Sequence, residues 1–120
     1  MSDISYTASG RRTIRMESEA VAALEARVGE SFDRACDLLL QTRGRVIVTG
    51  MGKSGHIARK IAATLASTGT PAFYVHPGEA SHGDMGMITA DDTVIALSNS
   101  GSVNEIDTLL PLLKRLGTPL

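Results

Sequence analysis

RVIVTGMGKSGH, residues 45–56, decides the fold of this chain. Three β-branched apolar residues, 46–48, precede glycines at positions 50, 52 and 55, and a helical pattern follows. A strand that runs through a glycine loop into a helix places backbone N–H groups and the positive end of the helix dipole beside one anion. Lys53 lies inside this loop, where a cation opposes the helix dipole unless an anion is bound next to it. The stretch therefore favours a phosphorylated ligand.

The segments around this loop alternate between helix and strand patterns. Upstream, apolar residues from Ile14 to Leu39 recur at helical spacing, with a break expected at Gly29. We expect strands over 45–49, 71–75 and 93–98, helices over 54–67 and 103–116, and a long connection over 76–92. Pro111 is expected to kink the last helix. This alternation predicts an α/β fold with a doubly wound, mostly parallel sheet and helices on both faces.

The chain reads as a flexible tail over residues 1–12 followed by one domain over 13–120. The tripeptide Gly69-Thr70-Pro71, between a helix and a strand, recurs as Gly117-Thr118-Pro119. By that parallel Leu120 begins a further strand, so we expect the domain to be incomplete at its C-terminus, after its third strand–helix unit.

The composition argues against several classes of protein. A net charge of −1 gives no signal for nucleic acid or membrane surfaces, and aromatic residues at 3% provide no base-stacking platform. No run approaches the ~20 apolar residues of a membrane helix, and the N-terminus lacks the apolar core of a signal peptide. Cys36 is the only cysteine, as is usual in a reducing compartment. We expect a cytoplasmic protein that binds neither nucleic acid nor membrane.

Three designs of phosphate loop compete for the glycine-rich stretch. A Walker A loop needs a glycine where Ile47 stands, so that design fails despite the Gly-Lys-Ser sequence. The dinucleotide fingerprint G-x-G-x-x-G matches, but the second strand ends in Tyr74-Val75-His76 without the acidic residue that holds a ribose. Glycines that serve packing alone remain an alternative. A small phosphorylated ligand without adenosine is favoured.

A second loop, Ser98-Asn99-Ser100-Gly101, follows the third expected strand. Ligands of open parallel sheets bind at the carboxyl ends of the strands, where neighbouring loops converge. Hydroxyls, an amide and N–H groups at a helix start suit a phosphate, although serine and asparagine also serve as ordinary helix caps. Spacing alone leaves both roles open.

Three further side chains are candidates for acid–base chemistry. Glu105 completes a capping box that starts at Ser102, and it is also placed to act as a general base one turn beyond the serine loop. His76 and His82 flank Pro-Gly-Glu-Ala-Ser, where they could bind a metal, hold a sugar hydroxyl, move a proton or lie in an ordinary surface loop. Three histidines and one cysteine make a structural zinc site improbable.

Four segments together resemble the sugar isomerase (SIS) domain and, more narrowly, the arabinose 5-phosphate isomerase family. They are GMGKSGHIARK (50–60), STGTP (67–71), HPGEASHGDMGM (76–87) and SNSG (98–101). The resemblance implies an aldose–ketose isomerase that interconverts D-arabinose 5-phosphate and D-ribulose 5-phosphate for synthesis of the Kdo sugar of lipopolysaccharide. It also implies a cytoplasmic homotetramer whose substrate is a small phosphorylated pentose. A non-catalytic, sugar-phosphate-binding regulatory SIS module is the alternative.

The same resemblance carries functional roles onto individual positions. Lys53, Glu105 and His82 match the family's catalytic lysine, glutamate and histidine. The substrate contacts that it implies are Ser54, Gly69, Thr70, His76, His82, Ser98, Asn99 and Ser100. No cofactor is required, although zinc can inhibit, with His76 as a metal contact. Val103 departs from the family, which usually has a serine or threonine there. A further glutamate and histidine, and a pair of CBS domains, would lie beyond residue 120.

Overall fold

The computed structural model describes residues 3–81, 83–102 and 104–120, without the side chains of Ser81, Asp84, Met85 and Glu105. Its internal contacts divide the chain into two compact units, Met1–Cys36 and Asp37–Leu120. The second unit contains the sheet and all of the predicted site residues.

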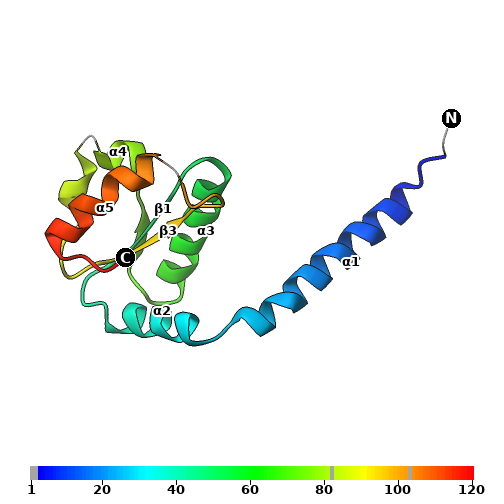
Figure 1. The fold of residues 1–120 in the computed structure, drawn as a ribbon, viewed down its shortest axis with the longest axis horizontal. Helices are drawn as coiled ribbons and strands as arrows, with labels where there is room; N and C mark the ends of the chain where they lie inside the picture. The colour runs from blue at the N-terminus through cyan, green and yellow to red at the C-terminus, as the bar shows by residue number, and fades with distance from the viewer. Residues whose placement is uncertain (1–2, 82, 103) are drawn as a thin grey trace. The chain divides into compact units, whose positions relative to one another are not determined.

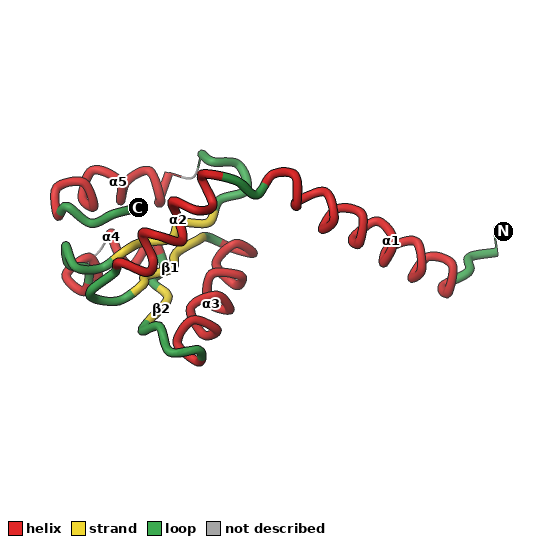
Figure 2. The backbone as a smooth tube through the Cα atoms, turned by 90° about the horizontal axis from the view of Figure 1, so that it is seen from below, coloured by secondary structure: helices red, strands yellow, loops and turns green. Residues whose placement is uncertain are grey.

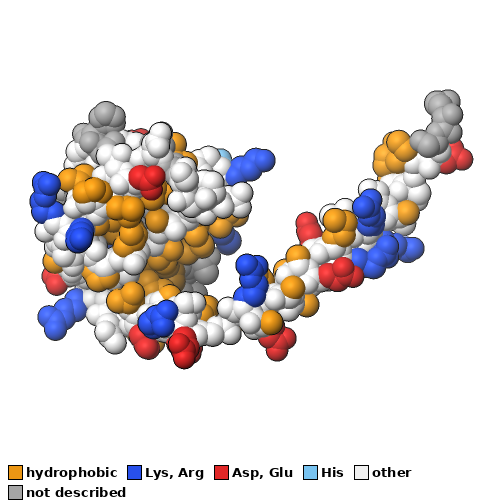
Figure 3. All heavy atoms as spheres, in the orientation of Figure 1, with side chains coloured by type: hydrophobic (Ala, Val, Ile, Leu, Met, Phe, Trp, Pro, Cys, Tyr) orange, Lys and Arg blue, Asp and Glu red, His pale blue; other side chains and the backbone are white. Residues whose placement is uncertain are grey.

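The first unit is helical from Tyr6. Helix α1 (Tyr6–Leu24) begins where the Ser5 hydroxyl accepts the Ala8 N–H at 3.2 Å, and the 3₁₀ turn η1 (Glu25–Arg27) follows it. Residues 6–12, expected in a flexible tail, are helical, because the Ser5 cap satisfies an N–H of the first turn and a helix can begin without apolar periodicity. None of the described α1 residues is buried, and hydrophobic side chains are visible along its surface (Figure 3).

The predicted break at Gly29 is confirmed. Val28 has extended backbone angles, φ −79° and ψ 119°, and helix α2 (Glu30–Gln41) begins immediately after Gly29. Two helices thus replace one long periodic segment.

The second unit is built on a three-stranded parallel sheet, as predicted. Strands β1 (Val46–Gly50), β2 (Ala72–Tyr74) and β3 (Thr93–Leu97) lie in the order β2-β1-β3. The register pairs Val48 with Tyr74 and Gly50 with Leu97. Because β1 is central, all of its residues are buried, which explains its uninterrupted β-branched run.

Helices cover both faces of this sheet (Figures 1 and 2). Helix α3 (Gly52–Ser67) lies on one side of the strands, and α5 (Asn104–Leu116), with Pro111 inside it, lies on the other. The expected long connection contains the short helix α4 (Pro77–Ser81) and the 3₁₀ turn η2 (Asp84–Met87). None of the described helices combines the length and apolar character needed to cross a bilayer.

Each face of the sheet has its own hydrophobic cluster. Ile47 and Val94 pack with residues of α4 and α5, whereas Val46 and Val48 pack with Ala58 and other residues of α3. Ile47, Val46 and Val48 are fully buried, and burying each such side chain contributes about 1.5–3 kcal/mol. The central strand therefore holds the two layers together.

The two Gly-Thr-Pro turns adopt the same structure. Gly69 and Gly117 have φ of 102° and 73°, in the left-handed region that favours glycine. In both turns the threonine N–H donates to the carbonyl five residues earlier, at 2.9 Å for Thr70 and 3.1 Å for Thr118. Each turn thus ends its helix with the same cap.

The prolines of these turns also have matching roles. The Pro71 carbonyl accepts the N–H of Val46 on β1 at 2.8 Å, and the Pro119 carbonyl accepts the N–H of Val94 on β3 at 2.9 Å. Each turn therefore sets the chain that follows it beside a neighbouring strand.

Candidate functional site

Three loops converge at the carboxyl edge of the sheet. The glycine loop follows Gly50 and the serine loop follows Leu97, and these two residues are paired in neighbouring strands. His76 lies two residues after Tyr74, whose partner in the sheet is Val48. This is the edge at which parallel α/β sheets bind their ligands.

Each of the three glycines in the first loop has a structural reason, either close packing or a positive φ. A Cβ on Gly50 would lie 3.0 Å from the Ser54 backbone, and one on Gly55 would lie 2.6 Å from the Gly50 carbonyl oxygen. Gly52 has φ of 56°, which other residues rarely adopt. The glycine spacing is thus explained by the turn itself, so the case for a ligand depends on the polar groups around it.

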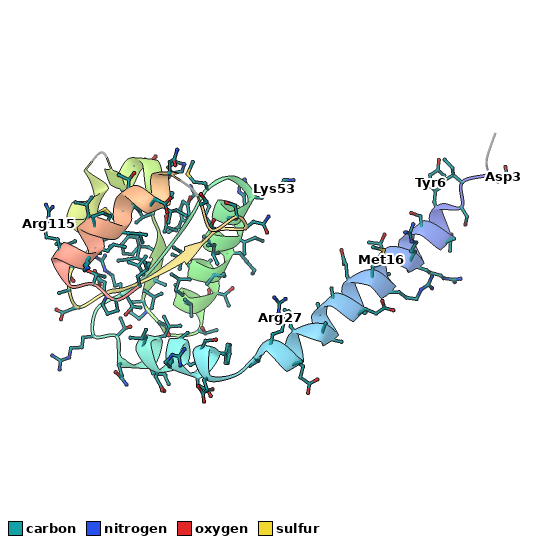
Figure 4. The ribbon with its side chains drawn as sticks, in the orientation of Figure 1. Asp3, Tyr6, Met16, Arg27, Lys53 and Arg115 are labelled. Carbon is teal, nitrogen blue, oxygen red and sulfur yellow. The ribbon has the colours of Figure 1, made fainter. Side chains whose placement is uncertain are left out.

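The start of α3 supplies polar groups that suit an anion. No described side chain caps this helix, whose first turn contains no acidic residue, and its first backbone bond runs from the Gly55 N–H to the Met51 carbonyl at 3.2 Å. The first-turn N–H groups and the helix dipole therefore favour negative charge here. Lys53 is exposed in this first turn of α3 and projects away from it (Figure 4), and Ser54 is half-buried beside it.

The serine loop is organised by its own hydroxyls. Ser98 Oγ accepts the Gly101 N–H at 2.9 Å, and Ser100 Oγ accepts the Ser102 N–H at 3.2 Å. A hydroxyl that accepts an N–H still has its own hydrogen to donate. The local role and a phosphate contact are therefore compatible, and the exposed Asn99 between them adds an amide. Val103, the departure noted in the sequence, lies outside the described residues.

A cavity opens where the glycine loop meets the end of β2. It has a volume of about 220 Å³, room for several waters at ~30 Å³ each or for part of a small sugar. Its walls are Gly52, Gly55, His56, Arg59, Tyr74 and His76. The cavity thus brings together residues of α3 and β2 that are about twenty positions apart in the sequence.

Tyr74 and Arg59 form one wall of this cavity. The Tyr74 hydroxyl donates to the Gly50 carbonyl at 2.7 Å, and the Arg59 guanidinium lies 4.1 Å from the centre of the tyrosine ring. Burial raises the pKa of Tyr74, although the positive charge of Arg59 acts in the opposite direction, so the phenol stays protonated and remains a donor. Arg59 was not singled out from the sequence as a site residue. Its position one helical turn after Gly55 was the available signal.

His76 is held in one orientation. Its Nδ1 accepts the Gly78 N–H at 3.0 Å, which leaves the proton of the neutral ring on Nε2. His76 is half-buried, and its Nε2–H is therefore a donor suited to a sugar hydroxyl. Since Nδ1 is engaged, Nε2 is the only nitrogen of this ring that could bind a metal.

Among the described residues, no group of three or more His, Cys, Asp or Glu side chains is close enough to hold a metal ion. His76 by itself does not make a zinc site, because a stable site needs at least three protein ligands. The inhibitory zinc contact therefore stays a prediction.

The predicted catalytic residues are only partly described. The backbone of Glu105 lies in the first turn of α5, but its side chain is not described, and His82 lies outside the described residues. Lys53 is the one whose side chain is described, and it lies at the carboxyl edge.

Gly69 and Thr70 lie elsewhere. They precede β2, at the amino edge of the sheet, where they cap α3. Within one chain they do not join the cluster around the glycine loop, and their contact with a substrate stays a prediction.

Comparison with known proteins identifies relatives of this fold and site. The family model described as the SIS domain matches residues 38–120. The arabinose 5-phosphate isomerase KdsD of Pseudomonas aeruginosa is 65% identical over 118 residues, which cover 98% of this chain and 36% of that protein. The KdsD of Escherichia coli K12 is 53% identical over 115 residues, which cover 96% of this chain and 35% of that protein.

A solved structure has the same architecture. The structure of a protein from Escherichia coli CFT073 in complex with arabinose 5-phosphate matches with a TM-score of 0.80 and 42% identity, over 96% of this chain and 63% of that one. The chain spans about a third of the length of the curated relatives that it matches.

Proposed function

We propose that this chain, which belongs to the SIS-domain family, is part of an aldose–ketose isomerase. The reaction that we propose interconverts D-arabinose 5-phosphate and D-ribulose 5-phosphate. The names of the relatives, and the arabinose 5-phosphate bound in the structure of a neighbour, support this choice of substrate.

The observation that carries the proposal is the convergence of the uncapped α3 N-terminus, the Ser98–Ser100 hydroxyls and the cavity at one sheet edge. Helix N–H groups and hydroxyls bind a phosphate monoester, and the cavity has room for the hydroxylated carbon chain. A nicotinamide cofactor fits less well, because His76 follows β2 where a ribose-binding acid would be required.

The chemistry requires a proton shuttle and stabilised oxyanion charge. A base removes the hydrogen from C2 of the open-chain aldose, the resulting enediolate is protonated at C1, and a proton moves from the C2 hydroxyl to the former C1 carbonyl oxygen. No net oxidation occurs. We assign the carbon proton transfers to Glu105, stabilisation of the enediolate to Lys53, and the hydroxyl protons or ring opening to His82.

The wider context follows the same family. We propose that the reaction supplies Kdo and lipopolysaccharide synthesis, that the enzyme is cytoplasmic and tetrameric, and that it needs no metal or other cofactor.

The test uses the protein expressed from its natural reading frame and incubated with D-arabinose 5-phosphate in deuterated water. The expected result is D-ribulose 5-phosphate in NMR spectra, with deuterium appearing at C2 of the aldose and C1 of the ketose. Glucosamine 6-phosphate serves as the control sugar phosphate and should not exchange.

Two outcomes would contradict an isomerase. Tight binding of arabinose 5-phosphate without exchange would make the protein a sugar-phosphate-binding module. Absence of both binding and exchange would remove the proposed substrate altogether.

A further inference from the structure

We propose that Tyr74 and Arg59 are positioning residues, which hold the glycine loop in the shape that binds the sugar phosphate. The inference rests on the proposed function, because it concerns the affinity of the same site. Neither residue belongs to the glycine or serine loops that supply the phosphate contacts.

The contact between Tyr74 and Gly50 ties two strands together beside the cavity. Gly50 is the last residue of β1, and its carbonyl accepts the tyrosine hydroxyl at 2.7 Å. Position 50 is also the point where the chain leaves the sheet to form the loop. A hydrogen bond from β2 to this carbonyl therefore fixes the direction in which the loop departs.

The loop closes tightly on the same hydroxyl. A Cβ placed on Gly55 would lie 2.9 Å from the Tyr74 hydroxyl oxygen and 2.6 Å from the Gly50 carbonyl oxygen. The tyrosine, the end of β1 and the first turn of α3 are thus in mutual contact. Movement of the hydroxyl would therefore displace Gly55, whose N–H makes the first backbone hydrogen bond of α3.

Arg59 keeps the ring in place. Its guanidinium lies over the ring at 4.1 Å, within the range of a cation–π contact, and it projects from α3, the helix that the loop feeds. Tyr74 on β2 thus contacts Gly50, which precedes the loop, and Arg59 on α3, which follows it. Since the hydroxyl hydrogen is used on Gly50, the pair acts through the loop and does not transfer a proton to substrate.

The first experiment substitutes Tyr74→Phe, which removes the hydroxyl and keeps the ring. The matched control is Tyr6→Phe, at the only other tyrosine of the chain, which is 84% exposed in α1. For Tyr74→Phe we expect KM for arabinose 5-phosphate to rise about fivefold, the effect of one lost hydrogen bond, with kcat changed less than about twofold. Tyr6→Phe should change neither.

A second measurement reads the loop without substrate. Hydrogen exchange of the Gly55 amide should become about fivefold faster in Tyr74→Phe, while the amides of β3 keep their wild-type rates. This readout decides whether the hydroxyl orders the loop even if arabinose 5-phosphate proves to be the wrong ligand. In that case the wild-type protein would show neither binding nor turnover, and the proposed function alone would fail.

A double-mutant cycle tests the role of Arg59. If Arg59 acts through the tyrosine, Arg59→Gln should raise KM in the wild-type background and add little in the Tyr74→Phe background. Fully additive effects would mean that Arg59 contacts the ligand directly, and they would contradict the proposal that Arg59 acts through Tyr74. A Tyr74→Phe variant with unchanged KM and unchanged Gly55 exchange would overturn the proposal, whatever its melting temperature.

Discussion

Gly55→Ala is the sharpest test of the packing at the glycine loop. The new methyl group would lie 2.6 Å from the Gly50 carbonyl oxygen and 2.9 Å from the Tyr74 hydroxyl oxygen. Neither neighbour is the far end of a flexible side chain, since the first is backbone and the second is anchored on it by a hydrogen bond. The loop or the tyrosine must therefore move.

The size of the effect follows from three contributions. Forcing a methyl group into a packed site costs about 1–3 kcal/mol, and loss of the tyrosine hydrogen bond costs about 1 kcal/mol. The better helix propensity of alanine returns up to ~1 kcal/mol. We expect a net loss of about 2 kcal/mol of unfolding free energy, which at a urea m-value of about 2 kcal/mol/M lowers the midpoint by about 1 M.

The assay is urea unfolding followed by far-UV circular dichroism, with Gly86→Ala as the matched control. No described atom lies within 4 Å of a Cβ on Gly86, which belongs to the same unit, and its φ is not positive. The control should stay within about 0.5 kcal/mol of the wild type. Equal midpoints for the two variants would refute the packing argument, and with it the contact between the loop and Tyr74.

Three other substitutions test catalysis and stability. Lys53→Gln should lower kcat at least ~100-fold with an unchanged melting temperature, as expected for lost oxyanion stabilisation. Lys60→Gln, at another exposed position of the same helix, should not change kcat, and equal activities of the two variants would remove Lys53 from the mechanism. Glu105→Gln should abolish deuterium exchange at C2 in a folded protein, and near-normal turnover would leave this residue only its capping role. Asp92→Asn should cost about 1–3 kcal/mol at pH 7, because this buried carboxylate accepts N–H groups of Arg45 and Thr89. Burial alone would raise the pKa of Asp92, but these donors outweigh burial and lower the pKa below its ordinary value of 3.8. The wild type should therefore lose the stability that the carboxylate contributes as the pH falls through this lowered pKa. Asp92→Asn should show a flatter pH profile of melting temperature. Asp91→Asn, at an exposed neighbour, is the control, and an equal pH dependence in both variants would refute the assignment.

The sheet was predictable because its signals are local. A buried central strand needs apolar side chains on both faces, and the run Val46-Ile47-Val48 provides them. Glycines and prolines marked most ends of the neighbouring elements, including the break at Gly29. The start of α1 was missed because its first two turns are polar and carry no apolar period, although Ser5 was readable as a cap.

The site was predictable only in part. The glycine and serine loops could be assigned to one edge because topology alone brings strand ends together. The wall formed by Arg59 and Tyr74 could not, since it depends on which face of α3 packs against β2. The orientation of His76 is likewise set by a contact with Gly78 that no spacing rule predicts.

The Gly69-Thr70-Pro71 turn has a consequence for a part of the molecule that it never touches. It fixes the phase of β2, in which Phe73 faces the layer of α5 and Tyr74 faces the layer of α3. Inserting one residue into the turn would move Phe73 to the place of Tyr74 and so bring a phenyl group without a hydroxyl toward Gly50. The length of this turn at one edge of the sheet thus governs which aromatic ring reaches the opposite edge. The turn should therefore tolerate insertions and deletions as poorly as the glycine loop does.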